Sequence, residues 1–274
     1  MTIRTALAQG SELLGRAGIP EPRLTTEVLL SHAIHRDRTY FFAHPEQELR
    51  EVEWLHYGRY LDERMKGKPT QYITKKQEFY GREFRVSRDV LIPRPETELL
   101  VETILKLNPG QGVLIDIGTG SGAIAITLAL ELRRRVIATD LSFEALEVAK
   151  SNALRLGATV DFLEADLFKC FADGGADIVI SNPPYVALSD RESLQREVRD
   201  WEPSLALYGG LSGTCIYERL IPEAWRVLKP GGILALELGA GQSEAVSALV
   251  TGWRNLRLFP DLAGIPRVLV CEKP

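Results

Sequence analysis

The chain has 274 residues, of which 45% are hydrophobic and 26% charged, and its formal net charge is −4. This length suffices for one large domain and a small one, and the negative balance argues against a protein whose whole surface follows nucleic acid. No apolar run reaches the roughly 18 residues that a membrane-spanning helix needs, and the N-terminus lacks the apolar core of a signal peptide.

Cysteine and histidine usage indicates neither disulfide bonds nor a metal site. Cys170, Cys215 and Cys271 are far apart and form no Cys-x-x-Cys pair, which is typical of free thiols in a reducing compartment. His32 and His35 lie three residues apart on a predicted helix, but no cysteine or second histidine pair accompanies them. We therefore expect a cytoplasmic protein that holds no metal ion.

Residues 1–75 are predicted to form a small helical domain. Apolar residues recur there at helical spacing in three stretches, and no stretch alternates in the way a strand does. Between Glu78 and Leu91 the pattern becomes strand-like, with Gly81 as a turn residue. We expect a β-hairpin linker over residues 76–93.

Strands and helices alternate over residues 94–274, which predicts a mostly parallel α/β sheet with helices on both faces. Ligands of such sheets bind at the carboxyl ends of the strands. The last two strands are compatible with a hairpin, which the pattern alone does not settle. The predicted strands are 112–117, 136–139, 160–163, 178–181, 233–238, 256–259 and 268–271, and the predicted helices are 123–132, 144–155, 214–228 and 243–250.

A glycine-rich turn separates the first strand of this sheet from the helix that follows it. Residues 118–122 read Gly-Thr-Gly-Ser-Gly, and glycine lacks the Cβ that would keep a nucleotide-like ligand away from the backbone. Asp140 closes the next strand, where a carboxylate can accept hydrogen bonds from both ribose hydroxyls. Asp116 precedes the turn, whose spacing departs from Gly-x-Gly-x-x-Gly. Both features resemble the methyltransferase pattern, while the turn itself leaves S-adenosylmethionine and a nicotinamide dinucleotide open as ligands.

The strand at 178–181 ends in Asn182-Pro183-Pro184-Tyr185. Two prolines make this turn rigid, and the end of the fourth strand lies beside the ligand in such a sheet. Methyl transfer from a sulfonium requires that the lone pair of the nucleophile point at the methyl group. The Asn182 side-chain oxygen and the Pro183 carbonyl can together hold the two N–H groups of a planar nitrogen, and Tyr185 can stack on it. The turn therefore predicts methylation of an amide or amino nitrogen.

The whole chain resembles the HemK/PrmC family of peptide chain release factor glutamine methyltransferases. The most specific likeness combines Asn-Pro-Pro-Tyr with Ile-Pro-Arg-Pro-Glu-Thr-Glu at residues 92–98. The resemblance implies a Rossmann-like class I methyltransferase sheet with one antiparallel strand near the C-terminus, joined by the hairpin to an N-terminal domain for release-factor recognition. It implies methylation of the glutamine in the Gly-Gly-Gln motif of class 1 release factors. Further matches lie at 78–84, 202–207, 209–210, 228–232, 236–239 and 261–264.

The same resemblance implies roles for individual residues. The catalytic residues would be Asn182, Pro183 and Tyr185. Substrate binding would add Pro184, Arg94 and Glu96, of which the last two are equally explained as the start of a helix. The residues that would bind S-adenosyl-L-methionine, and release S-adenosyl-L-homocysteine, are Ile117, Gly118, Thr119, Gly120, Ser121, Asp140, Leu167 and Asn182.

Two other functions are compatible with parts of the pattern. An amino methyltransferase acting on adenine or guanine would use the same turn, but it would need a surface that follows phosphates. Residues 1–75 hold 11 Lys or Arg against 10 Asp or Glu, and the basic surplus at 66–94 is modest. A non-catalytic binding module is disfavoured because both turns are intact. We expect no stable nucleic-acid partner, no membrane contact and a monomer.

Overall fold

The computed structural model describes residues 1–107, 110 and 112–274 and divides the chain into two compact units. The helical unit comprises Met1–Lys76 together with Gln195–Trp201, and the α/β unit comprises Gln77–Leu194 and Glu202–Pro274. In the part of the chain that the structure describes, no helix is both long and apolar enough to traverse a lipid bilayer.

The long helices of the helical unit pack their buried apolar residues into one shared core. Ile3 and Leu14 of the first helix, Leu29 of the second and Leu61 of the fourth are at most 3% exposed and belong to one core. Tyr57 lies in this core, and its hydroxyl donates to the carbonyl of Ala6 at 3.1 Å. The helices are α1 (Ile3–Arg16), α2 (Pro22–Ile34), α3 (Arg38–Ala43), α4 (Glu51–Met65), α5 (Thr70–Thr74) and, from the later segment, α9 (Arg196–Trp201).

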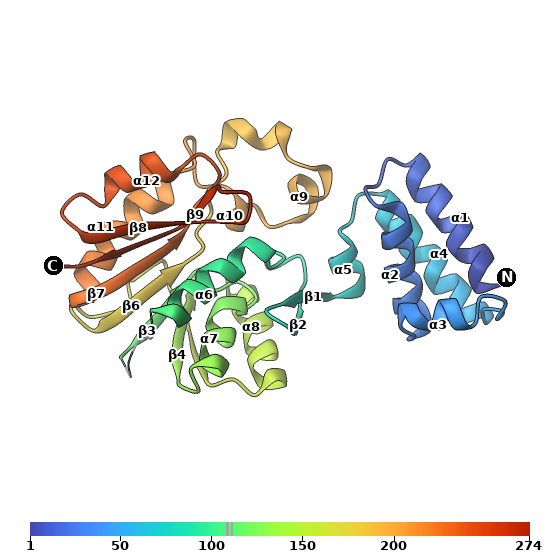
Figure 1. The fold of residues 1–274 in the computed structure, drawn as a ribbon, viewed down its shortest axis with the longest axis horizontal. Helices are drawn as coiled ribbons and strands as arrows, with labels where there is room; N and C mark the ends of the chain where they lie inside the picture. Colours follow the sequence, from blue (N-terminus) through green and yellow to red (C-terminus); the bar gives the residue numbers. More distant parts are fainter. Residues whose placement is uncertain (108–109, 111) are drawn as a thin grey trace. The chain divides into compact units, whose positions relative to one another are not determined.

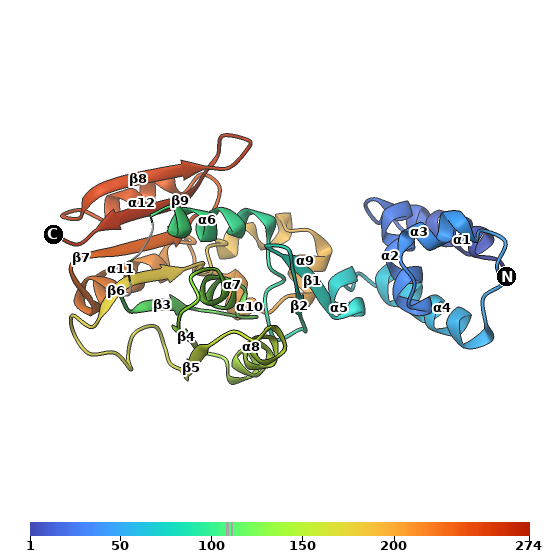
Figure 2. The same ribbon diagram turned by 60° about the horizontal axis from the view of Figure 1, so that its bottom comes forward.

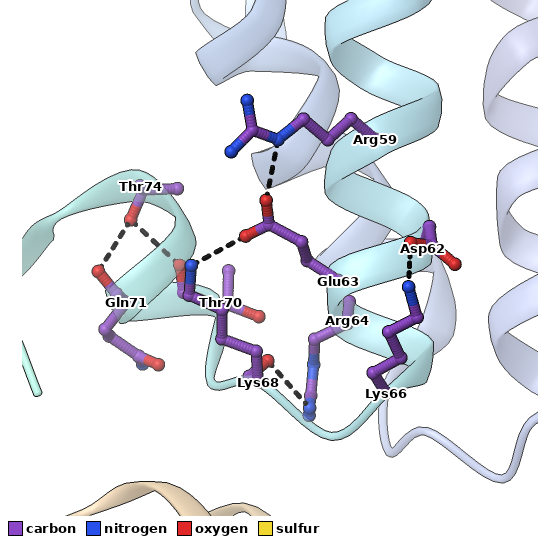
Figure 3. A network of polar contacts seen from close by, with 9 residues as sticks. All are labelled: Arg59, Asp62, Glu63, Arg64, Lys66, Lys68, Thr70, Gln71 and Thr74. Carbon is purple, nitrogen blue, oxygen red and sulfur yellow. Dashed lines mark hydrogen bonds and ion pairs between the residues drawn. The ribbon is translucent and has the colours of Figure 1, made fainter.

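The junction of α4 and α5 is held by polar contacts (Figure 3). Glu63 receives Arg59 Nε at 2.8 Å and Lys68 Nζ at 2.6 Å. Arg64 donates to the carbonyl of Lys68 at 3.3 Å and pairs with Glu197 of α9 at 2.5 Å. Because the Arg64 side chain is only 6% exposed, this pair is screened less by solvent than a surface salt bridge. Residues 195–201 are thereby tied to the helical unit.

The α/β unit contains a seven-stranded sheet in the order β5-β4-β3-β6-β7-β9-β8. All neighbours from β5 to β7 pair in parallel, whereas β9 is antiparallel to both β7 and β8. The mostly parallel sheet with one antiparallel strand is thus confirmed (Figures 1 and 2). The strands are β3 (Leu114–Ile117), β4 (Val136–Asp140), β5 (Val160–Glu164), β6 (Ala176–Ser181), β7 (Leu228–Glu237), β8 (Arg254–Pro260) and β9 (Pro266–Glu272).

Helices cover both faces of the sheet because strand side chains alternate. Ile178 and Ile180 of β6 face a core shared with the green helices α6 (Glu98–Lys106), α7 (Ala123–Glu131) and α8 (Phe143–Leu156). Val179 faces the opposite core, which is shared with α11 (Cys215–Val227) and α12 (Ser243–Leu249). The connecting segments add η1 (Pro95–Thr97), η2 (Leu188–Ser193) and α10 (Ser204–Leu207).

The predicted linker hairpin is present as β1 (Lys76–Phe79) and β2 (Arg82–Arg85). Tyr80 and Gly81 both have positive φ, 50° and 67°, the geometry of a tight turn whose twist matches the strands. Phe79 and Phe84 are buried side by side with ring centroids 6.0 Å apart. The predicted strand at 233–238 begins earlier, at Leu228, and pairs with β6 through a register shift. The spacing of apolar residues in the sequence does not reveal a register shift of this kind.

Candidate functional site

A cavity of about 490 Å³ opens at the carboxyl ends of β3, β4 and β6 in the α/β unit. Its lining brings together the glycine turn, the end of β4, the segment after β5 and the Asn-Pro-Pro-Tyr turn. Every residue predicted to bind the cofactor lines it, as do Pro183, Pro184 and Arg94. Tyr185 and Glu96, predicted to contact the substrate, are not among the lining residues.

The glycine turn is built for close approach to its backbone. Gly118, Gly120 and Gly122 have φ of 73°, 56° and 82°, a region that glycine enters without strain. A Cβ added at Gly118 or Gly120 would meet no heavy atom within 4 Å. Glycine suits these two positions for two reasons. It adopts their positive φ without strain, and its lack of a side chain leaves space in the cavity next to the backbone.

Two carboxyl groups flank the turn. Asp140 accepts from the N–H of Gly120 at 2.8 Å and from that of Ser142 at 2.9 Å, and burial raises the pKa of its carboxyl. Asp116 is completely buried and accepts from the Thr119 hydroxyl at 2.7 Å. Burial, with a contribution from Asp140, raises the pKa of Asp116 to about 7. A cation placed here would favour the ionised form of both carboxyl groups.

Asp140→Ala is expected to weaken S-adenosylmethionine binding by about 10- to 100-fold, because it removes an acceptor facing the cavity and the partner of the Gly120 N–H. Equilibrium titration of the variant with S-adenosylmethionine measures the effect. Glu164→Ala is the matched control, since Glu164 pairs with Asp140 across the strands and does not line the cavity. Equal affinities of Asp140→Ala and the wild type would contradict the role of Asp140.

The segment after β5 presents Leu167 to the cavity in a conformation that leucine rarely adopts. Its φ is 53°, a left-handed conformation that costs a residue with a Cβ about 1 kcal/mol or more. The preceding Asp166 pairs with Lys169 and Arg219, both at 2.8 Å. These ion pairs hold the loop in which the Leu167 side chain adjoins the cavity.

The Asn-Pro-Pro-Tyr turn lies at the end of β6, beside the glycine turn. Ser181, which precedes it, donates to the carbonyl of Ile117 at 2.7 Å and joins the two strand ends. Asn182 Nδ2 donates to Thr97 Oγ1 at 3.1 Å. Burial raises the pKa of Tyr185 to about 12, and the Glu237 carboxylate adds to this effect, so the phenol stays protonated near neutral pH.

Residues distant in sequence hold the turn in place. Gln242 donates to the carbonyl of Tyr185 at 2.8 Å. The N–H of Val186 donates to Leu207, and the N–H of Gly209 donates back to Val186, both at 2.9 Å. The chain after the two prolines is therefore fixed on two sides, which restricts the position of the Asn182 side chain.

Arg94 reaches the site with its charge already paired. Its guanidinium contacts Glu202 at 2.6 Å, and the same carboxylate accepts from the N–H of Ile92 at 3.3 Å. Glu202 is 5% exposed, so removing Arg94 would leave a buried charge that has lost a partner. Glu96 is exposed, and its negative charge raises the pKa of the Glu237 carboxyl.

Three residues at the site were not anticipated from the sequence. Asn152 of α8 donates to the carbonyls of Arg85 and Ser121, both at 2.9 Å, and so ties the linker hairpin to the glycine turn. Thr97 and Glu237 lie next to Asn182. Thr97 and Glu237 fall in the segments 92–98 and 236–239 that carry the family resemblance, but the pattern assigns them no role at the site, and nothing distinguishes Asn152 from an ordinary helix residue. Within residues 1–107, 110 and 112–274, no cluster of three or more His, Cys, Asp or Glu could hold a metal ion.

Both units match known protein families. Residues 5–74 match a model described as the PrmC N-terminal domain, and residues 95–199 match one described as the methyltransferase small domain. The second match contains both turns that line the cavity.

Curated relatives match along the whole chain. A release factor glutamine methyltransferase from Koribacter versatilis is 45% identical over 278 residues, covering 100% of this chain and 99% of that protein. One from Moorella thermoacetica is 42% identical over 281 residues, with the same coverage. Among solved structures, a methyltransferase from Pyrococcus furiosus has a TM-score of 0.55 at 23% identity over 74% of this chain and 93% of that one, which supports the fold alone.

Proposed function

The chain belongs to the family of release factor glutamine methyltransferases, and from this premise we propose that it methylates the side-chain amide of the glutamine in the Gly-Gly-Gln motif of class 1 release factors. The methyl donor is S-adenosyl-L-methionine. The observation that carries the proposal is that Asn182 lines the same cavity as the glycine turn. A single cavity then holds the methyl donor and an amide-binding side chain.

The described residues fit this cofactor. Gly118 and Gly120 leave backbone space for its amino acid part, Asp140 would accept from its ribose hydroxyls, and Leu167 would lie at its adenine. Buried Asp116, just below the turn, adds negative potential for an ammonium group. When bound, the cofactor supplies an electrophilic methyl group on a positively charged sulfur.

The substrate amide is a weak nucleophile because its nitrogen lone pair is delocalised into the carbonyl group. The Asn182 side-chain oxygen and the Pro183 carbonyl would accept from its two N–H groups and aim the lone pair at the methyl group. Tyr185, which stays protonated, would shape the slot rather than act as a base, and Pro184 would form its wall. Arg94 and Glu96 would act at the entrance of the slot.

We also propose that the helical domain, residues 1–75, recognises the release factor, and that the enzyme works as a cytoplasmic monomer. The match of residues 5–74 to a family-specific N-terminal domain supports the first point. Cys170, Cys215 and Cys271 are free thiols, in keeping with a reducing compartment. Two experiments test these points. Met1–Lys76 should capture a release factor in a pull-down, and sedimentation of the full-length protein should show a single monomeric species.

Incubation with radiolabelled S-adenosylmethionine tests the substrate. We expect label on purified class 1 release factor and none on DNA or RNA, because the family relatives act on a protein. Replacing the glutamine of the Gly-Gly-Gln motif by alanine in the release factor should remove the label, since the nucleophile is lost. Label on nucleic acid alone, or on the glutamine-free release factor, would contradict the proposal.

A further inference from the structure

The register of the sheet brings a buried glutamate next to Asn182. In the parallel pair of β6 and β7, Ser181 lies opposite Leu236, so Asn182 and Glu237 follow at the same edge of the sheet. Glu237 ends β7 and is 2% exposed, and it does not line the cavity. It therefore lies beside Asn182 and outside the cavity lining.

Thr97 connects the Asn182 amide to the surroundings of this carboxyl group. Asn182 Nδ2 donates to Thr97 Oγ1 at 3.1 Å, and the Thr97 hydroxyl and the Asn182 side chain both lie near enough to the Glu237 carboxyl to lower its pKa. An ionised carboxylate only accepts hydrogen bonds, so it can face Nδ2 but not the side-chain oxygen of asparagine. The oxygen of Asn182 is thus turned away from Glu237 and toward the cavity.

The surroundings of Glu237 leave its charge poorly compensated. Among the described residues, Oε2 has no hydrogen-bond partner, and the Tyr217 hydroxyl on α11 donates to the main-chain carbonyl of Glu237 instead. Burial raises the pKa of Glu237 to about 7; the Thr97 hydrogen bond and Arg267 on β9 lower it, and Glu96 on η1 raises it. Tyr185, after β6, contributes no charge near neutral pH because its own pKa is raised to about 12.

We infer that Glu237 is a positioning residue for methyl transfer: its carboxylate, with Thr97, orients the Asn182 amide and makes the Asn182 oxygen a stronger acceptor for the substrate N–H. This inference rests on the proposed function. Negative charge behind the amide polarises it, and chains of hydrogen bonds strengthen one another in a site of low dielectric constant. The same negative charge stabilises the positive charge that develops on the attacking nitrogen in the transition state.

Glu237→Gln tests the inference in the full-length enzyme, since it keeps the shape and one acceptor but removes the charge. With S-adenosylmethionine and release factor, we expect kcat to fall by roughly 10- to 100-fold. We expect KM for the release factor and the Kd for S-adenosylmethionine to change less than about threefold, because Glu237 does not line the cavity.

The pH dependence separates an electrostatic role from a merely structural one. Because ionisation activates the site, the wild-type kcat should rise with pH through an inflection near or below 7, and Glu237→Gln should lack this rise. A raised carboxyl pKa means that the folded state loses stability as pH rises from the unfolded value through about 7. The thermal stability of Glu237→Gln, relative to the wild type without cofactor, should therefore improve between pH 5 and pH 8.

Glu131→Gln is the matched control, since Glu131 ends α7 in the same unit and pairs with Arg82 away from the cavity. It should keep the wild-type kcat and its pH profile. Should Glu237→Gln fail to fold, Thr97→Val interrupts the same connection and should lower kcat while retaining the pH-dependent rise, and Thr97→Ser should restore the rate.

The outcomes distinguish this inference from the proposed function. Wild-type transfer to the release-factor glutamine, with an unchanged kcat and pH profile in Glu237→Gln, would overturn the inference and leave the function standing. If Glu237→Gln fails to fold, a wild-type kcat in Thr97→Val would likewise overturn the inference and leave the proposed function standing. Absence of wild-type transfer to that glutamine would overturn both.

Discussion

Asn182→Ala is expected to lower kcat for release-factor methylation by about 10²- to 10³-fold. The change removes the side-chain oxygen that faces the cavity, so the substrate amide loses the acceptor that aims its lone pair. It also removes Nδ2, which donates to Thr97, and with it a group that lowers the pKa of the buried Glu237 carboxyl. Single-turnover kinetics with labelled S-adenosylmethionine measures the methyl-transfer step directly.

Cofactor binding distinguishes this effect from loss of the site. The glycine turn and the segments around Asp140 and Leu167 line the cavity independently of Asn182, so the variant should bind S-adenosylmethionine within about tenfold of the wild type. Asn255→Ala removes an equivalent amide near the start of β8, outside the cavity lining, and should keep the wild-type rate. Full activity of Asn182→Ala would refute the role of Asn182.

Gly209→Ala is expected to impair the enzyme although Gly209 does not line the cavity. A Cβ at this position would lie 2.5 Å from the carbonyl oxygens of both Pro184 and Gly213. Both obstacles are backbone atoms, so the Asn-Pro-Pro-Tyr turn itself must shift. We expect a loss of about 1–3 kcal/mol in the free energy of unfolding from this overpacking. A turn displaced by a fraction of an ångström should also lose roughly 10- to 100-fold in kcat.

The matched control for this substitution is Gly175→Ala. The Cβ added there would meet only the carbonyl oxygen of Ala172, at an ordinary 3.7 Å, and Gly175 has no positive φ. It should retain the stability and the rate of the wild type in thermal melts and methyl-transfer assays. A Gly209→Ala protein with wild-type Tm and kcat would show that the turn tolerates displacement.

The sequence by itself determined the fold class and the two turns that define the cavity. Gly118–Gly122 and Asn182–Tyr185 could be recognised because each is a contiguous segment whose backbone chemistry admits few residue types. Strand and helix alternation placed both turns at the carboxyl ends of strands, where the structure has them. The sequence did not predict element boundaries as well. The start of β7 was missed because a register shift between strands does not change the spacing of apolar residues along the chain.

Only the tertiary structure decided what surrounds those turns. Glu237 meets Asn182 through the parallel register of β6 and β7, and Gly209 is confined by a carbonyl 25 residues earlier in the chain. Residues 195–201, which the alternating pattern assigns to the catalytic part, are grouped with the helical unit through contacts such as Arg64 with Glu197. Such contacts depend on which strand edges and loops meet in space. Local propensity and residue spacing carry no information about such contacts. In a glycine turn or a double proline, by contrast, the residue types themselves show how the backbone is restricted.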